Sequence, residues 1–282
     1  MSVRHLLKPL ALLILVGTLA GCSSSMFGGD KKAAVDTQPP DVLYNEADTL
    51  LKKSEYTKAA AKFEEVDRQH PYSKEARASI LMSAVAYEKA GKLPEATAAA
   101  RRYLTLHPGT KEAALAQHII ANAYYDRIND PSRDQSDTKK AMVELETLVN
   151  RYPNSRYASQ ARKRIRLSRD VLAAHEMHVG RWYMKRGEHL AAINRFRVVV
   201  TDYPRTAHVE EALMRLTECY YTLGIANEAQ TAAAVLGHNF PNSKWYKDAY
   251  ALLTSKGLQP HEHSGSWISR AWRATFSSSK RK

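Results

Sequence analysis

Cysteine is scarce in this chain of 282 residues, which has only Cys22 and Cys219. Cys219 lies in an apolar stretch, 213–223, that we expect to be helical. In such a stretch a buried small side chain is a far more common role for cysteine than a reactive thiol. A fold built on several disulfides is therefore excluded, but a chain of this length can bury a large core without them.

The sequence also lacks an apolar run of about 20 residues, the length that a membrane-spanning helix needs. The apolar run 10–19 follows the basic residues Arg4 and Lys8 and leads into Leu19-Ala20-Gly21-Cys22. A short apolar core after a basic start is typical of a signal peptide. The small residues before Cys22 make it resemble a bacterial lipoprotein signal, in which the cysteine is acylated and becomes the N-terminus. An ordinary secretory peptide with an incidental cysteine is the alternative.

We therefore expect residues 1–21 to be a lipoprotein signal peptide and Cys22 to carry a lipid anchor (palmitate). Serine rather than aspartate follows the cysteine, which by the same resemblance favours the outer membrane. The small, polar segment 22–40 ends in proline and is predicted to be a lipidated, flexible tether. The expected location is the periplasmic face of the outer membrane.

The balance of charge is strongly basic, with a formal net charge of +13 that becomes +11 once Arg4 and Lys8 leave with the signal peptide. Such a charge suits nucleic acid, anionic lipid or an acidic protein, and the expected compartment excludes nucleic acid. One basic run, 156–169, contains no acidic residue, and the run from Arg270 to the C-terminus contains none either. The simplest interpretation of both is a solvated surface.

Signals for catalysis are missing. No glycine-rich phosphate loop, nucleophile elbow or Cys-x-x-Cys pair occurs. The segment His175-Glu176-Met177-His178 is one residue short of the zinc-protease spacing, and His261 and His263 lie in a predicted loop without a third ligand. We therefore expect no enzyme, no catalytic residue, no metal site and no cofactor.

A repeat fills the rest of the chain. Five times an aromatic residue or histidine precedes proline, and a small polar residue follows two places later; the prolines are Pro71, Pro108, Pro153, Pro204 and Pro241. Proline cannot continue a helix, and serine or threonine then caps the next one. The prolines are 37, 45, 51 and 37 residues apart, a period with insertions that is typical of stacked helical hairpins.

Other positions keep the same register. The residue twelve before each proline is alanine in all five units, which predicts close helix crossings: Ala59, Ala96, Ala141, Ala192 and Ala229. Seventeen before the proline stand Gly91, Gly187 and Gly224, with Ser54 in the first unit, and we predict a tight turn there. These offsets resemble the tetratricopeptide repeat. The expected fold is all-α, a superhelical array of five tetratricopeptide-like helical hairpins over 41–257.

Two units are irregular. The polar segment 129–137 predicts a loop inserted between the two helices of the third unit. The fourth unit shows no break between Ser155 and Arg186, which predicts one unusually long first helix.

Stacked hairpins offer a groove lined by the first helix of each unit. The repeat register places nine mixed aromatic, amide and charged residues there, a composition that suits an extended peptide, although solvent exposure alone would also explain them. The candidates are Tyr44, Asp48 and Lys52 in unit one, Val85, Glu88 and Lys89 in unit two, and His118, Asn122 and Tyr125 in unit three.

Several motifs, taken in order, carry a family resemblance: Tyr152-Pro153-Asn154-Ser155, then Arg186-Gly187 followed by Ala191, Asn194-Arg195 and Asp202-Tyr203-Pro204. With the lipoprotein signal and the five repeats, the chain from Cys22 to about Gly257 resembles the BamD (ComL-type) family of lipoproteins of the outer-membrane β-barrel assembly (BAM) complex. Gln135 and Thr201 depart from the pattern, since proline and a basic residue are expected there.

The resemblance implies a role without catalysis in protein insertion into the outer membrane. The first two units would bind unfolded outer-membrane protein precursors. The last two would dock on the periplasmic domains of the barrel-forming BAM subunit, with Arg186, Asn194 and Arg195 as candidate docking residues. Accessory BAM lipoproteins would be further partners. The alternative is another periplasmic tetratricopeptide lipoprotein, such as a secretin pilotin or a cell-envelope coordinator.

The segment 258–282 lies beyond the resemblance. Ile268, Trp272 and Phe276 are spaced for one side of a helix, with Arg270 and Arg273 toward the other. A basic amphipathic helix that orders only on a membrane surface or a partner is one hypothesis, and a disordered tail is the other.

Overall fold

The computed structural model describes the backbone of residues 38–277 and the side chains of residues 38–274. The expected signal peptide, Cys22 and nearly all of the tether lie outside the described residues, as do Phe276 as a side chain and the last five residues of the basic tail. The described chain from Pro40 onward forms one compact unit.

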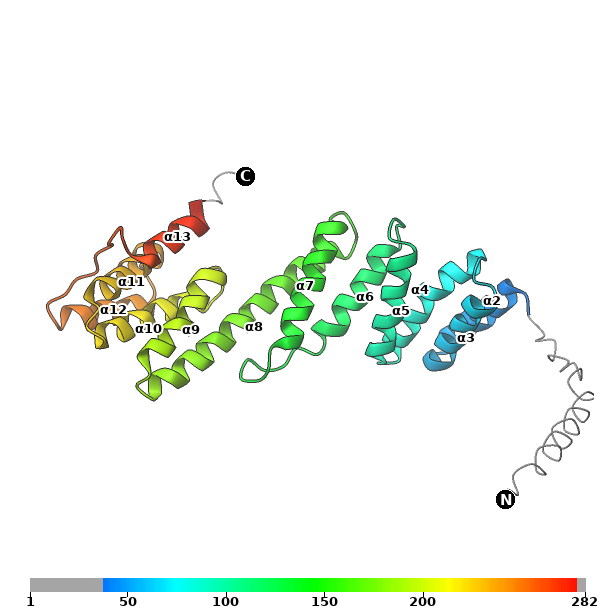
Figure 1. The fold of residues 1–282 in the computed structure, drawn as a ribbon, viewed down its shortest axis with the longest axis horizontal. Coiled ribbons are helices and arrows are strands. Elements are labelled where there is room, and N and C mark those ends of the chain that lie inside the picture. The colour runs from blue at the N-terminus through cyan, green and yellow to red at the C-terminus, as the bar shows by residue number, and fades with distance from the viewer. Residues whose placement is uncertain (1–37, 278–282) are drawn as a thin grey trace, which may run out of the picture. The chain divides into compact units, whose positions relative to one another are not determined.

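The prediction of an all-α hairpin array is confirmed, since the described residues contain helices and no strand. Five hairpins follow one another, and each helix packs against the next in sequence (Figure 1). The pairs are α2 (Pro40–Lys52) with α3 (Tyr56–Gln69), α4 (Lys74–Lys89) with α5 (Leu93–Leu106), α6 (Ala113–Tyr125) with α7 (Ser136–Arg151), α8 (Ala158–Lys185) with α9 (His189–Asp202), and α10 (Val209–Thr222) with α11 (Ala226–Asn239). In the described part of the chain no helix is both long and apolar enough to cross a membrane.

The tight turns within the hairpins form where they were predicted. Gly91, Gly187 and Gly224 have φ of +72°, +76° and +74°, and Ser54 has +62°. In each turn an N–H reaches back five residues to a helix carbonyl, as Lys92 does to Tyr87 at 2.9 Å. This bond defines a Schellman ending, which needs one residue in the left-handed region and therefore favours glycine.

The aromatic or histidine residue before each proline ends the second helix of its hairpin. His70, His107, Tyr152, Tyr203 and Phe240 have φ between −136° and −125°. Steric contact with the proline ring disfavours helical angles at the preceding residue, and the chain turns there.

The predicted serine and threonine caps form in two of the five units. Ser73 accepts a hydrogen bond from the N–H of Ala76 at 3.0 Å, and Ser243 accepts one from the N–H of Trp245 at 3.2 Å. In both places the next helix begins at the following residue.

In the other three units the cap prediction is wrong, because an extra turn of two residues precedes the helix. The N–H groups of Ala113, Ala158 and Val209 bond to the carbonyl three residues earlier, on the residue expected to be the cap. The Thr110 and Thr206 hydroxyls donate backward to the carbonyl oxygens before proline, at 3.1 and 2.9 Å. These side chains stabilise the bend rather than the helix start.

The alanines that recur twelve residues before proline are all fully buried, which confirms the predicted close crossings. Phe63 and Phe196, eight before their prolines, are fully buried as well. The backbone of α8 also comes close to α9, since Gly180 lies against the ring of Phe196 with no room for a Cβ. Small residues thus allow the helices to cross closely, and Phe63 and Phe196 fill the space beside two of these crossings.

Both irregular units are as predicted, with one shift of a boundary. The third-unit loop runs over 126–135, and α7 begins at Ser136, inside the segment expected to be loop. Gln135 is buried, and its amide donates to the carbonyls of Asp130 and Arg133, both at 3.0 Å. The first helix of unit four, α8, is a single helix of 28 residues.

After the fifth proline α12 (Lys244–Thr254) packs against α10 and α11. It buries Ala249 and Leu253, whereas Lys247, Asp248 and Ala251 on its other side are exposed.

The C-terminal segment forms helix α13 (Trp267–Ser277), which packs against α9 and α11. Ile268 is fully buried, Trp272 is 8% exposed, and the Trp267 indole N–H donates to the Tyr220 hydroxyl at 2.8 Å. The hypothesis that this helix orders only on an outside surface is wrong, because its apolar side is already covered by the repeats.

Candidate functional site

The first helices of units two, three and four share a set of polar contacts that we call the central polar cluster: Glu88, His118, Asn122, Tyr125, Tyr157 and Arg164. The Asn122 amide nitrogen donates to Glu88 at 3.2 Å and lies 3.0 Å from His118 Nε2. The Arg164 guanidinium donates to the Asn122 amide oxygen. A single amide thus joins α4, α6 and α8.

Aromatic rings pack around this amide. The Arg164 guanidinium lies 4.4 Å above the ring of Tyr125, a cation–π distance. His118 stacks on Tyr157 with 4.3 Å between ring centroids. The Arg156 guanidinium lies 4.9 Å from the centroid of the Tyr157 ring. The cluster therefore combines hydrogen-bond donors with flat apolar surfaces.

Histidine contributes no charge to the cluster at neutral pH. Burial, followed by the positive charges of Arg164 and Arg156, lowers the pKa of His118 to about 4. Glu88 is thus the negative group of this region, and the two arginines are its positive groups.

The remaining groove candidates lie outside the cluster. Asp48 pairs with Lys52 at 2.6 Å, and Tyr44 packs edge-on against Phe63 with centroids 5.3 Å apart. Val85 packs against the core of unit two. Lys89 lies 5.7 Å from the ring of Tyr56, a residue of the same region that was not a candidate.

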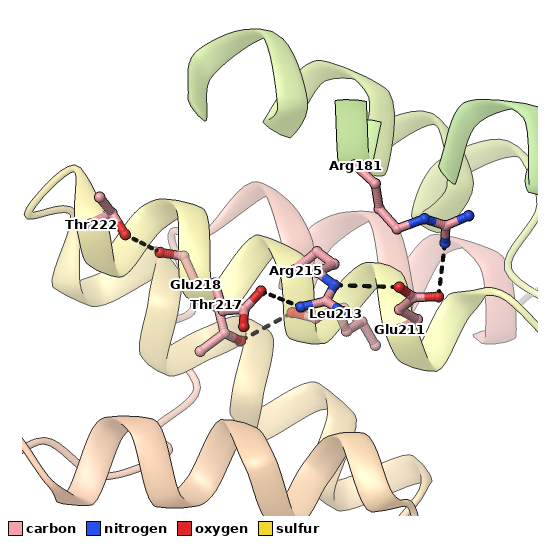
Figure 2. A network of polar contacts seen from close by, with 7 residues as sticks. All are labelled: Arg181, Glu211, Leu213, Arg215, Thr217, Glu218 and Thr222. Carbon is pink, nitrogen blue, oxygen red and sulfur yellow. Dashed lines mark hydrogen bonds and ion pairs between the residues drawn. The ribbon is translucent and has the colours of Figure 1, made fainter. Parts of the chain in front are cut away.

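A second polar network joins the first helices of the last two units (Figure 2), and we call it the ion-pair ladder: Arg181, Glu211, Arg215 and Glu218. Arg181 of α8 donates to Glu211 at 3.0 Å, and Arg215 of α10 donates to Glu211 at 3.3 Å and to Glu218 at 2.8 Å. Arg215 also lies 5.2 Å from the ring of Trp245 on α12.

The ladder is self-neutralising, with two positive and two negative side chains. Burial opposes the charge of Arg215, but hydrogen bonds and charges from Glu218 and Glu211 outweigh it and raise its pKa. Its two glutamates are 15% and 24% exposed at the side chain, so each is largely withdrawn from solvent.

The three docking candidates do not meet. Arg186 ends α8, where it stacks 4.6 Å from the ring of Trp182 and pairs with Glu188 at 2.9 Å. Arg195 pairs with Glu176 of α8 at 3.3 Å, nearly two helical turns into α9. Asn194 is exposed beside it.

The structure adds residues that the sequence did not single out for binding. Arg164 and Tyr157 complete the central polar cluster, and both lie in or beside the basic run 156–169. Trp182 is 50% exposed and Leu190 65% exposed at the α8–α9 turn next to Arg186. In the sequence, the signal available for this surface was Trp182 itself, a large aromatic residue one helical turn before the docking candidate Arg186.

The described residues hold no group of three potential metal ligands. His175 is bound to the Pro131 carbonyl oxygen at 2.7 Å and fixes the third-unit loop on α8. Burial raises the pKa of the Cys219 thiol to about 12, which keeps it protonated and unreactive. These side chains are structural.

Comparison with known proteins matches residues 36–236 to the family model described as YfiO, outer membrane lipoprotein. An outer membrane protein assembly factor BamD from Caulobacter vibrioides is 41% identical over 89% of this chain and 82% of its own length. The protein of the same name from Rickettsia prowazekii is 39% identical over 88% of this chain and 97% of its own length. A third, from Neisseria meningitidis, is 34% identical over 86% and 96% of the two chains. With its hairpins, turns and matched span, this chain belongs to the BamD family of outer membrane lipoproteins.

Proposed function

We propose that this chain is a non-enzymatic assembly factor for outer membrane proteins, which holds unfolded barrel precursors along its N-terminal repeats and docks on the barrel-forming subunit through its C-terminal repeats. The relatives bear the name of outer membrane protein assembly factors, which supports the general role. The observation that carries the binding role is the central polar cluster. It joins three consecutive repeats through one amide.

The cluster suits an extended peptide because it offers donors and acceptors that are only partly used within the chain. Asn122 and Arg164 are half-buried, and a guanidinium has five N–H donors in a fixed fork. An extended peptide presents free carbonyl and N–H groups along its length, and the rings of Tyr125 and Tyr157 supply apolar contact for its side chains.

The ion-pair ladder favours a different role for the last repeats. Its charges are already paired, so inserting a peptide there would cost desolvation of groups that gain little in return. The exposed surface lies instead at the α8–α9 turn. There Trp182 and Arg186 are of the residue types that dominate binding energy at protein interfaces, and Leu190 adds exposed apolar area beside them. We assign docking on the barrel-forming subunit to this turn, together with Asn194 and Arg195.

Attachment to the outer membrane belongs to the same proposal. Cys22 carries the lipid, and the repeats face the periplasm, where accessory lipoproteins of the same complex also bind. A pilotin or cell-envelope coordinator is the less favoured alternative. The match covers 82% and 97% of two relatives that are named as assembly factors.

Peptide binding tests the N-terminal role. We expect Asn122→Ala/Arg164→Ala to bind a labelled peptide from the last strand of an outer membrane barrel roughly tenfold more weakly than the parent, because two charge-assisted or amide hydrogen bonds are lost. Lys163→Ala is the matched control, since Lys163 is exposed on the same helix and makes no polar contact with the described residues of the cluster. Equal affinity of parent and double variant in fluorescence anisotropy contradicts the assignment.

Co-purification with the barrel-forming subunit tests the docking role. Arg195→Glu should abolish it, because the variant presents a carboxylate where the partner meets a guanidinium. That variant also places a second carboxylate beside that of Glu176. The swap Glu176→Arg/Arg195→Glu restores the internal ion pair and is the control. Recovery of the complex by the swap would show that Arg195 acts only within the chain.

A further inference from the structure

A groove runs between α3 and α5 along one side of α4, and we call it the bipolar groove. It consists of two adjoining hollows, of about 690 Å³ and about 250 Å³, which share the lining residues Asp67, Ile80 and Arg102. No residue of the central polar cluster or of the α8–α9 turn lines either hollow. The groove is therefore separate from both sites of the proposed function.

The end of the groove at the start of α4 is basic. Lys74 and Arg77 line the larger hollow, are exposed, and make neither a hydrogen bond nor an ion pair with any described residue. The acidic residue of this hollow, Asp67, is buried and pairs with Arg102 at 2.5 Å. The N-terminus of α4, the positive end of its helix dipole, follows the cap Ser73 at the same place. Two positive side chains are thus left free at this end.

The opposite end is acidic. Glu64 and Glu95 line the smaller hollow, are exposed, and form no ion pair with a described residue. Burial, followed by the charge and hydrogen bond of Glu64 and the charge of Glu95, raises the pKa of Tyr87 to about 12. Both carboxylates therefore lie close to one hydroxyl, and they remain free to attract a cation from outside the chain.

The two ends are far enough apart to act separately. Glu95 and Leu106 line opposite ends of the groove and are eleven residues apart on α5, which corresponds to about 16 Å along the helix. Screening by salt at physiological ionic strength acts over about 8 Å. The positive and negative ends therefore do not cancel each other, although the groove as a whole has no net charge.

Apolar side chains accompany these charges. Tyr72 is 100% exposed and Leu106 is 52% exposed at the basic end, and Ile80 lies in the lining that the two hollows share. Tyrosine is one of the residue types that contribute most to binding energy at protein interfaces. The groove thus combines apolar contact area with opposite charges at its two ends.

We infer that the bipolar groove binds a short segment of a partner protein that carries acidic residues at one end, basic residues at the other and apolar residues between them. The acidic residues of this segment lie against Lys74 and Arg77, and its basic residues lie against Glu64 and Glu95. A bilayer surface or a nucleic acid does not fit, because the two free carboxylates repel a uniformly negative surface. The inference does not depend on the proposed function.

Fluorescence anisotropy on the full-length protein in detergent tests this directly. The probe is a labelled, end-capped peptide of two glutamates, three apolar residues and two lysines, in that order. The control peptide has the same composition, with glutamate and lysine side by side at each end, so that neither end has a net charge. The probe should bind the parent at least tenfold more tightly than the control peptide does, because only the probe matches both ends of the groove. Equal binding of the two peptides, or no binding of the probe, overturns the inference.

Two double variants each remove one end of the groove. Lys74→Glu/Arg77→Glu should bind the probe at least tenfold more weakly than the parent, because two attractive contacts become repulsive. Glu64→Gln/Glu95→Gln should bind it several-fold more weakly, and Tyr72→Ser should weaken binding without any change of charge. Binding of the probe that is equal in the parent and in either double variant overturns the inference.

A matched variant separates a local site from overall charge. Lys53→Glu/Lys247→Glu changes the net charge as much as Lys74→Glu/Arg77→Glu does, at two exposed positions away from the groove. It should bind the probe as the parent does, and a tenfold loss overturns the inference. Circular dichroism of all variants must show the helical content of the parent.

The N-terminal segment 23–39 of this chain is the competing occupant. Its two lysines, Lys31 and Lys32, have Asp30 before them and Asp36 after them, so the segment does not separate the two signs of charge. Lys31→Gln/Lys32→Gln should therefore leave the affinity for the probe unchanged. Tighter binding in this variant would identify the segment as the occupant and overturn the inference.

The membrane has its own measurement. Lipidated protein is reconstituted into vesicles of neutral lipid and into vesicles with 30% anionic lipid. The affinity for the probe, which has no net charge, should be the same in both. Tenfold weaker binding on the anionic vesicles would identify the bilayer as the occupant and overturn the inference.

Discussion

The side-chain amide of Asn122 links three consecutive repeats. Asn122 belongs to α6; its amide nitrogen donates to Glu88 on α4, and its amide oxygen accepts from Arg164 on α8. The neighbouring His118 is held neutral by burial and by two arginines. The state of this histidine therefore affects contacts among three repeats.

The first prediction concerns pH and His118. Its pKa is about 4 in the folded protein and about 6.5 in the unfolded chain. Above pH 6.5 both states are neutral at this position and stability is fully present. Between pH 6.5 and 4 only the unfolded chain takes up the proton, which costs the folded protein up to about 3 kcal/mol.

Denaturant titrations at pH 7.5 and 4.5 check this value. The parent should lose more stability on acidification than His118→Gln, which keeps an amide near Asn122 but cannot titrate. Parallel losses in the two proteins would show that another group is responsible.

The second prediction concerns Ser54, which adopts φ of +62° where the equivalent turns have glycine. A side chain in this region costs about 1 kcal/mol or more. Ser54→Gly should therefore raise the free energy of unfolding by roughly 0.5–1 kcal/mol, because relief of this strain exceeds the added entropy of the unfolded chain. Gly91→Ser, with φ of +72°, is the reverse control and should destabilise the protein. A loss of stability in Ser54→Gly would contradict the assignment of strain.

Helices and turns were largely predictable from the sequence, whereas contacts between repeats were not. Proline and glycine act on their own backbone, so helix ends and left-handed turns follow from residue type. The caps at Thr110 and Thr206 were mispredicted, because whether a hydroxyl bonds forward or backward depends on a two-residue turn with no distinctive composition. The central polar cluster needs three helices at a set distance, and the register alone found Glu88, His118 and Asn122 but not Arg164.

The third prediction concerns α13. Trp272 packs edge-on against Phe240 with 6.0 Å between ring centroids and is almost fully buried. Trp272→Ala should cost about 3 kcal/mol at the C-terminal end, since a large aromatic contact is removed. Hydrogen exchange should then accelerate in α11 and α13 while α2 to α5 stay unchanged.

Ala274→Ser is the control for α13, because Ala274 is exposed on the same helix. Unchanged exchange in Trp272→Ala would mean that α13 contributes nothing to the last repeats.

The molecule as a whole is held together by neighbour contacts. From α2 to α12 each helix packs on the next, and α13 returns to pack on α9 and α11. In such arrays the effect of a substitution fades with distance along the sequence. The proposed precursor and docking sites can therefore be altered one at a time without unfolding the other.

The fourth prediction concerns the membrane anchor. Cys22→Ala should release the protein from isolated outer membranes into the soluble fraction, because the proposed lipid would be lost while the repeats remain folded. Carbonate extraction followed by immunoblotting measures this, and the parent is the control. Retention of an unlipidated Cys22→Ala protein in membranes lacking the barrel-forming subunit would contradict the assignment of the anchor.

Helix α12 has a consequence for self-association. An array that stacks by one geometry could in principle accept the first hairpin of another molecule at its open end and grow into a fibre. The outward side of α12 instead carries the charges of Lys247 and Asp248 beside Ala251, and the neighbouring Tyr250 is 46% exposed. An incoming helix would have to remove both charges from water in order to stack there. Polymerisation through this end is thereby disfavoured, which matters for a protein that a membrane would hold at high local concentration.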